Sequence, residues 1–152
     1  MTTPEAVQDR YPESVSYCYG CGRNNKSGLK VRSIPEGDEW VARFTPRPEH
    51  MAVPGFVYGG LLASLIDCHG VGTAAAASLG SDDHGQEMPR FVTGSLTVNY
   101  LKPTPLGPEL ELRARPLEIG ERKVRVNVTV NVGETECVRG EVLAVRLPDS
   151  MQ

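Results

Sequence analysis

The sequence lacks the features that mark several broad classes of protein. Its 152 residues carry a net charge of −3 and contain no basic run, which argues against a nucleic-acid-binding surface. The longest weakly polar run, residues 70–79, is too short for a membrane span and consists mostly of Ala and Gly. The N-terminus shows no basic segment followed by an apolar one, so no signal peptide is expected. We therefore predict a single cytoplasmic domain over residues 1–152, with no membrane or nucleic-acid partner.

Metal-ligand patterns are also scarce. Cys18 and Cys21 form one CxxC pair, whereas Cys68 and Cys137 are isolated in the sequence and the three His give no HxxxH. A structural zinc site usually takes four ligands, from two such pairs or from a pair with well-spaced His. A redox CxxC normally caps a helix, but here the loop-forming stretch GRNNKSG follows. The pattern favours a turn with reduced thiols, and it predicts neither a metal nor a cofactor.

Turn-forming residues divide the chain into short segments. A polar, proline-containing lead is followed by two short apolar runs around the turn PEGD, and three prolines then exclude regular structure before the glycine pair. After the glycine pair, the apolar residues recur at helical spacing. After the polar loop at 80–89, they alternate with polar residues, as in a strand. The predicted elements are an irregular lead at 1–16, strands at 28–34 and 39–45, a helix at 60–78, and strands at 91–101, 109–115, 123–132 and 137–147.

The late strands should form an antiparallel meander, because short turns join them. Five valines alternate without a break from Val124 to Val132, which indicates a half-buried strand. The strand at 91–101 places Thr93, Ser95, Thr97 and Asn99 on one face. One helix must then cover the apolar face of the whole sheet, so the helix should be central and largely buried.

The predicted helix has two distinct faces at 100° per residue. One face carries large apolar residues, and the neighbouring face carries small residues and one carboxylate. Small residues allow another backbone or a ligand to approach closely. A carboxylate on a buried helix is costly unless it is paired or used. The large face holds Leu62, Leu65, Ile66, His69, Thr73 and Ala76, and the small face holds Ala63, Asp67, Gly70 and Ala74.

The start of this helix is a candidate oxyanion site. Gly59 and Gly60 lack Cβ atoms, so a ligand oxygen can approach the unpaired backbone amides of the first turn. Asp67 follows eight residues later, about 10 to 12 Å along the axis at 1.5 Å per residue. That separation is too large for both groups to act on one carbonyl, so the spacing predicts a site shared between two subunits.

Four further polar residues need separate interpretations. Residues two apart on a helix do not face each other, so His69 is expected to be a satisfied core histidine and not a partner of Asp67. Ser64 is interpreted as a packing residue. Thr93 and Ser95 either contact a substrate or water, or lie on a solvated strand face.

Three stretches resemble the PaaI-type acyl-CoA thioesterases of the hotdog-fold thioesterase superfamily: GFVYGGLLASLID, FVTGSLTVNYLKPTPLG and ELELRARPLEIGERKVRVNVTV. The lead YCYGCG is similar to the CFGCG opening of many such proteins. The resemblance covers about residues 15–147. It implies an α+β hotdog fold, with an antiparallel sheet around one long helix, and a dimer or dimer of dimers with active sites between subunits.

The resemblance also implies roles for individual residues in hydrolysis of an acyl-CoA, whose coenzyme A is part of the substrate. The Gly59 amide would polarise the thioester carbonyl, Asp67 would act as general base or nucleophile, and Thr93 would assist. Family members usually carry His where this sequence has Tyr58. Substrate binding is assigned to Tyr58, Gly60, Gly94, Ser95, Arg90 and Lys102.

Two other functions are kept as alternatives. The Tyr58 departure motivates a non-catalytic acyl-CoA-binding protein that retains the fold. A hotdog hydratase would place an Asp and a His a few residues apart at the loop–helix region, but His69 is the only nearby His and points elsewhere on the helical wheel.

Overall fold

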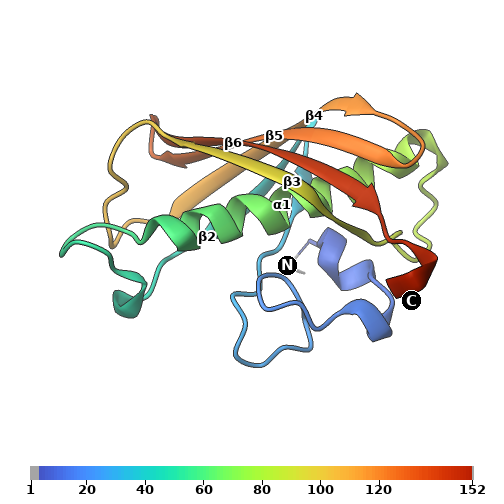
Figure 1. Cartoon of the computed structure of the whole chain (residues 1–152), viewed down its shortest axis with the longest axis horizontal. Helices are drawn as coiled ribbons and strands as arrows, with labels where there is room; N and C mark the ends of the chain where they lie inside the picture. The colour runs from blue at the N-terminus through green and yellow to red at the C-terminus, as the bar shows by residue number, and fades with distance from the viewer. Residues whose placement is uncertain (1–3, 152) are drawn as a thin grey trace.

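A computed structural model describes residues 4–151 and consists of one long helix held against one antiparallel sheet (Figure 1). The helix α1 spans Gly59–Leu79, close to the predicted bounds. The strands are β1 (Ile34–Glu36), β2 (Glu39–Phe44), β3 (Phe91–Tyr100), β4 (Leu110–Ile119), β5 (Lys123–Val132) and β6 (Thr135–Arg146). Single 3₁₀ turns are η1 (Val7–Arg10), η2 (Glu13–Val15), η3 (Pro48–His50), η4 (Gly80–Asp82) and η5 (Asp149–Met151).

The sheet order is β1-β2-β4-β5-β6-β3, and every neighbouring pair is antiparallel. The predicted meander is correct for β4, β5 and β6 but wrong for β3, which pairs with β6 at the far edge. The loop after β3 carries the chain to the opposite half of the sheet, where β4 pairs with β2. As a result β3 has only one strand neighbour within residues 4–151.

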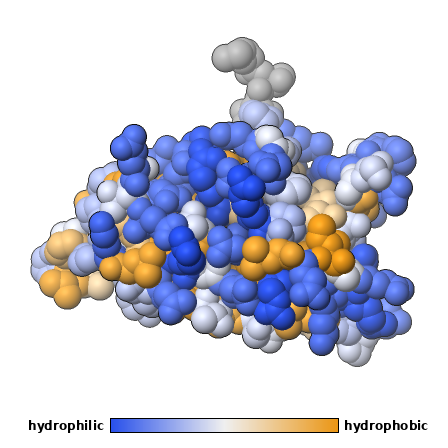
Figure 2. All heavy atoms as spheres, turned by 90° about the horizontal axis from the view of Figure 1, so that it is seen from above, coloured by the Kyte–Doolittle hydropathy of each residue, from blue (hydrophilic) through white to orange (hydrophobic). Residues whose placement is uncertain are grey.

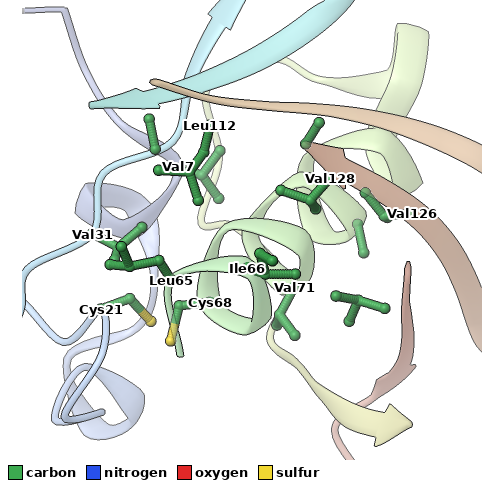
Figure 3. Packing of buried hydrophobic residues seen from close by; sticks show 14 of the residues in the cluster. Val7, Cys21, Val31, Leu65, Ile66, Cys68, Val71, Leu112, Val126 and Val128 are labelled. Atoms are coloured by element: carbon green, nitrogen blue, oxygen red, sulfur yellow. The ribbon is translucent and has the colours of Figure 1, made fainter. Parts of the chain in front are cut away.

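The core lies between α1 and the sheet, as the alternating valines predict. Val124, Val126, Val128 and Val130 of β5 are fully buried. Figure 3 shows Val126 and Val128 beside the helix. The helix packs tightly against the sheet at Gly70, where an added Cβ would lie 2.5 Å from Cγ2 of Val142. At Gly70 the small face of the helix therefore packs against the valine side chains of β5 and β6.

The N-terminal lead closes the other side of α1. It was predicted to be irregular, but it forms η1 and η2 and lies on the opposite side of the helix from the sheet (Figure 1). Val7 and Tyr11 are buried, and Val7 N–H donates to the Ser33 carbonyl at 3.0 Å. The helix is thus enclosed by the sheet above and the lead below.

The strand predicted at 28–34 is wrong except at its last residue, Ile34. Leu29, Val31 and Ser33 are buried and alternate with more exposed neighbours, which explains the prediction. Their amides, however, find acceptors outside the sheet: Leu29 N–H donates to the Tyr19 carbonyl and Val31 N–H to the Gly20 carbonyl. The segment therefore pairs with the CxxC loop and not with a strand.

The outer face of the sheet is charged. Figure 2, seen from the sheet side, shows mainly hydrophilic residues with separate hydrophobic groups between them. Arg113 of β4 contacts Glu111 on its own strand, Glu39 on the neighbouring β2 and Glu36 on β1. Arg125 of β5 pairs with Glu141 of β6 at 2.7 Å. This face is a solvated surface.

One helix in the described residues is long and apolar enough to span a membrane, α1 with its following turn (Gly59–Asp82). The most apolar part of that stretch is 78% buried within the fold. The segment is the core helix of the domain.

Candidate active site

The first half of α1 keeps one side uncovered. The partly exposed positions are Gly59, Gly60, Ala63, Ser64 and Asp67, which recur at helical spacing, whereas residues 68–77 are all buried. Asp67 therefore lies on the small face, away from the leucines, as the helical wheel predicted.

Thr93 meets Asp67 on this uncovered side. The Thr93 hydroxyl of β3 donates a hydrogen bond of 2.5 Å to Asp67 Oδ1. This contact brings together two residues 26 positions apart that the sequence had assigned to one reaction. The second carboxylate oxygen, Oδ2, accepts no hydrogen bond within residues 4–151.

A bulge in β3 turns Thr93 toward the helix. The register with β6 shifts between Thr93 and Ser95, so that Thr93 pairs with Ala144 and Ser95 with Leu143. Ala144 faces the core and Leu143 does not, so Thr93 and Ser95 lie on opposite faces of the sheet. The prediction that they share a face is therefore wrong.

Gly94 makes this bulge possible. A Cβ there would lie 2.8 Å from Cγ2 of Val145 and 3.1 Å from the Leu143 carbonyl oxygen. The substrate contacts predicted for Gly94 and Ser95 stay predictions, and the geometry gives Gly94 a role in directing Thr93.

The electrostatics of Asp67 suit a proton acceptor. Partial burial raises the pKa of its carboxyl above the ordinary value, and the Thr93 hydrogen bond opposes that rise. Arg90 lines the same pocket, of about 190 Å³, and stacks over the Tyr11 ring at 4.7 Å. The carboxylate thus has one hydroxyl donor, one nearby cation and access to a cavity.

The start of α1 forms a second polar centre. Neither the Gly59 nor the Gly60 amide donates a hydrogen bond in the part of the chain that the structure describes. Tyr100 of β3 donates from its hydroxyl to the Gly59 carbonyl at 2.7 Å. Tyr58 is 57% exposed, and its ring lies beside Gly60, where a Cβ would be 2.5 Å from the ring.

The predicted substrate residues divide between these two centres. Lys102 lines a pocket of about 330 Å³ with Gly59, Tyr100 and Leu101, whereas Arg90 lines the Asp67 pocket. The eight-residue separation of Gly59 and Asp67 is kept in an unbroken helix, about 12 Å along its axis. One chain therefore does not bring the unpaired amides and the carboxylate together.

His69 is a satisfied core histidine, as predicted. It is fully buried, and the Trp40 carbonyl, which can only accept, takes a hydrogen bond from His69 Nε2 at 3.0 Å. His69 Nδ1 therefore accepts from the Ser33 hydroxyl at 2.8 Å. Burial lowers the pKa of His69 to about 4, which keeps the ring neutral.

Sequence reasoning missed a cysteine cluster next to Asp67. The ligand atoms of Cys18, Cys21 and Cys68 all lie within 4.8 Å of one another. Cys68 had been interpreted as isolated, because it is 50 residues from Cys18 in the chain. No spacing in the sequence signals the cluster, because it depends on how the N-terminal segment packs against α1.

The sheet order, the single central helix and the polar centres on its uncovered side define a hotdog-fold protein. The model of the thioesterase superfamily matches residues 54–138, more than half of the chain. The chain belongs to the thioesterase superfamily. This membership supports thioester hydrolysis as the activity.

Solved structures agree with this assignment. A thioesterase superfamily protein from Shewanella loihica PV-4 is 43% identical, with a TM-score of 0.71 over 91% of this chain and 100% of that one. The PaaI protein from the Escherichia coli phenylacetic acid degradation operon is 16% identical, with a TM-score of 0.64 over 79% and 81% of the two chains. A Streptococcus mutans protein bound to acetyl CoA is 23% identical, with a TM-score of 0.58 over 77% and 88%. No protein of curated function matches the chain.

Proposed function

We propose that this protein hydrolyses an acyl-CoA thioester to a free acid and coenzyme A, at a site formed between two copies of the chain. One observation carries the proposal: a half-buried carboxylate, Asp67, accepts a hydrogen bond from Thr93 on the only uncovered side of a core helix in residues 4–151. Partial burial of a charged carboxylate lowers the stability of the fold. A catalytic role for Asp67 explains why the sequence carries a carboxylate there.

The proposed chemistry uses few groups. As general base, Asp67 removes a proton from water while the water oxygen attacks the thioester carbonyl carbon. The carbon–sulfur bond then breaks, and the leaving thiolate takes the proton back from the Asp67 carboxyl. Alternatively the carboxylate itself attacks the carbonyl carbon, and the carbon–sulfur bond breaks to release the thiolate. Water then hydrolyses the resulting anhydride, and a proton from that water goes to the thiolate. In both routes the Gly59 amide of the other subunit stabilises the developing oxyanion.

A homodimer could bring the Asp67 carboxylate of one chain close to the Gly59 amide of the other. The free edge of β3 is ten residues long and runs beside the uncovered side of α1. An exposed edge with apolar side chains is a site for pairing with another chain. The exposed large apolar residues around it are Phe56, Tyr58, Leu96, Tyr100 and Leu101. We propose that two β3 edges meet, so that each Asp67 lies near the partner's helix start. A further pairing of dimers is compatible with this arrangement.

Two cationic side chains and one structural relative support an acyl-CoA as the substrate. Arg90 and Lys102 provide cations near the two centres, which suits the phosphates of coenzyme A. The Streptococcus mutans protein of the same fold binds acetyl CoA. The four free cysteines suit a reducing compartment, and we propose that the enzyme works in the cytoplasm.

Subunit complementation tests the shared site. Asp67→Asn removes the base, and Gly59→Pro removes the amide hydrogen while keeping a residue that is favoured at the first helical position. Each homodimer should lose about 100-fold or more of kcat on the best substrate from a panel of acyl-CoAs. A heterodimer carrying one substitution on each chain retains one intact site and should recover about half of the wild-type rate.

The outcome separates the alternatives. A heterodimer as inactive as both parents would contradict a site shared between chains. Equal slow rates for the wild type and both variants on every thioester would contradict the mechanism itself. Ser64→Ala serves as a control for general disturbance of the first helical turns, because it removes only a hydrogen bond to the Gly60 carbonyl and keeps Asp67 and both unpaired amides.

The position of Tyr58 favours one second candidate, a non-catalytic acyl-CoA-binding protein. Its ring lies against Gly60, where a bound thioester would have to approach the first amides. Saturable binding of acyl-CoA without turnover, with turnover appearing in Tyr58→His, would establish this candidate over the enzyme.

A further inference from the structure

Three cysteines from two distant segments meet beside Asp67. Cys18 and Cys21 come from the loop after the lead, and Cys68 comes from the third turn of α1. Figure 3 shows the sulfur atoms of Cys21 and Cys68 directed toward each other across the gap between loop and helix. Cys21 and Cys68 are buried and Cys18 is half-buried.

The sulfur spacing is compatible with a metal site. A zinc ion holds thiolates at about 2.3 Å in a tetrahedron, so neighbouring sulfur atoms lie about 3.8 Å apart. The Sγ atoms of Cys18 and Cys68 are 3.8 Å apart, and all three ligand atoms lie within 4.8 Å of one another. An ion can therefore be placed among the three sulfur atoms with only small changes in side-chain angles.

Two glycines allow the loop to bring the cysteines close together. A Cβ on Gly20 would lie 2.3 Å from the Cys68 sulfur, and one on Gly22 would lie 2.4 Å from the Cys18 backbone nitrogen. The Gly22 amide donates to the Cys18 carbonyl at 2.7 Å, which closes the turn between the paired cysteines. Hydrogen bonds from Leu29 and Val31 hold the loop in place.

We propose that Cys18, Cys21 and Cys68 bind one zinc-type divalent cation, with the fourth coordination position open. No fourth His, Cys, Asp or Glu ligand atom joins the cluster within residues 4–151. The three sulfur-bearing residues line the same pocket as Asp67, Arg90 and Thr93, so that water can reach the fourth position. This is the ligand count of zinc sites that keep an exchangeable position.

The charges are compatible with such a site. Binding displaces three thiol protons, and three thiolates with one divalent cation leave a net charge of −1. The Arg90 guanidinium lines the same pocket and offsets that charge. The proposal does not depend on the thioesterase activity, because the ligands are independent of Asp67 and Thr93.

Metal content of the full chain tests the proposal. Protein expressed with zinc in the medium, purified under reducing conditions and freed of any affinity tag, should contain about one zinc per chain. Replacement by Co²⁺ should give the intense visible bands of a tetrahedral cobalt site and thiolate charge-transfer absorption. Cys18→Ser, Cys21→Ser and Cys68→Ser should each weaken binding by more than the roughly 10- to 100-fold expected for outer-shell changes.

Cys137→Ser is the matched control. Cys137 is also a buried free cysteine, but it lies on β6 outside the cluster, so this variant should bind zinc and cobalt like the wild type. If Cys68→Ser does not fold, Cys18→Ser at the half-exposed position carries the test, with folding checked by circular dichroism. Reduced wild type without stoichiometric metal, or equal binding by the Cys18→Ser variant, would overturn the proposal. A disulfide of Cys18 with Cys21 or Cys68 in protein freshly isolated from a reducing cytoplasm would also overturn it.

Discussion

The two halves of α1 differ in what covers them. Residues 69–77 are buried on every side, by the sheet on one side and the N-terminal lead on the other. In residues 59–67, one side stays partly exposed, although the sequence is as apolar as in the second half. The helix is continuous, so its environment and not its secondary structure separates the halves.

The polar groups of the two halves differ in their hydrogen-bond partners. In the covered half, His69 has partners for both ring nitrogens and Gly70 serves close packing. In the uncovered half, the Gly59 and Gly60 amides have no acceptor within residues 4–151, and Asp67 has a single hydroxyl donor. Substitutions in the first half should therefore change activity, and substitutions in the second should change stability.

The largest expected effect comes from Asp67→Asn. If Asp67 moves the proton, kcat should fall about 10²- to 10⁴-fold while the free energy of unfolding stays equal or increases, because a half-buried charge is removed. Steady-state kinetics and urea unfolding of the same preparation measure both. Ser64→Ala, one turn earlier on the same side, is the control and should leave kcat unchanged. A parallel loss of stability and activity would contradict the division.

Thr93→Val should have the next largest effect on catalysis. The substitution keeps the shape of the side chain and removes a hydrogen bond to a carboxylate, worth about 1.5–3 kcal/mol. Transition-state stabilisation of that size corresponds to a roughly 10- to 150-fold loss in kcat. Thr97→Val, at a residue beyond the bulge that pairs with Glu141 on the outer face, should show no such loss.

Gly70→Ala should destabilise the covered half. The new Cβ would lie 2.5 Å from Cγ2 of Val142, so overpacking of about 1–3 kcal/mol should exceed the helix-propensity gain of roughly 1 kcal/mol. Chemical denaturation should show this loss with kcat of the folded protein retained. In a double-mutant cycle, Val142→Ala should suppress part of the cost; strict additivity would mean that the two side chains do not clash.

The smallest effect is expected on the outer face of the sheet. Arg113→Ala removes ion pairs with Glu39, Glu111 and Glu36, all in contact with solvent. Exposed ion pairs contribute less than about 1 kcal/mol each, so the free energy of unfolding should change little. The change should be smaller still at high salt, which screens these pairs. A loss comparable to that of Gly70→Ala would show that this face is covered in the native assembly.

Much of the fold could be predicted because its strongest signals are periodic. The alternation Val124–Val132 and the helical period after Gly60 each depend on local geometry, and both predictions are confirmed. The position of β3 at the sheet edge depends on which strands pair after a long loop, which the local pattern does not specify. The segment at 28–34 alternates in burial as predicted, yet its amides pair with a loop.

The candidate site was predictable in its residues but not in its arrangement. Asp67 and Thr93 could be chosen from residue type and family resemblance, and the structure places them in contact. The bulge at Gly94 could not be read from an alternating pattern, so Ser95 was assigned to the wrong face. The cysteine cluster was missed because it depends on packing of the lead against α1, which gives no signal in sequence spacing.

The glycine bulge in β3 also separates the strand into two independent stretches. Before it, odd-numbered positions point inward; after it, even-numbered ones do, so one inserted residue changes the phase of the strand. A hydroxyl can therefore face the helix at position 93 without any change in the apolar phase of residues 96–100. A substitution in one stretch therefore leaves the orientation of the other stretch unchanged. The side chain beside the carboxylate can be altered without turning the apolar residues of the free edge to the other face.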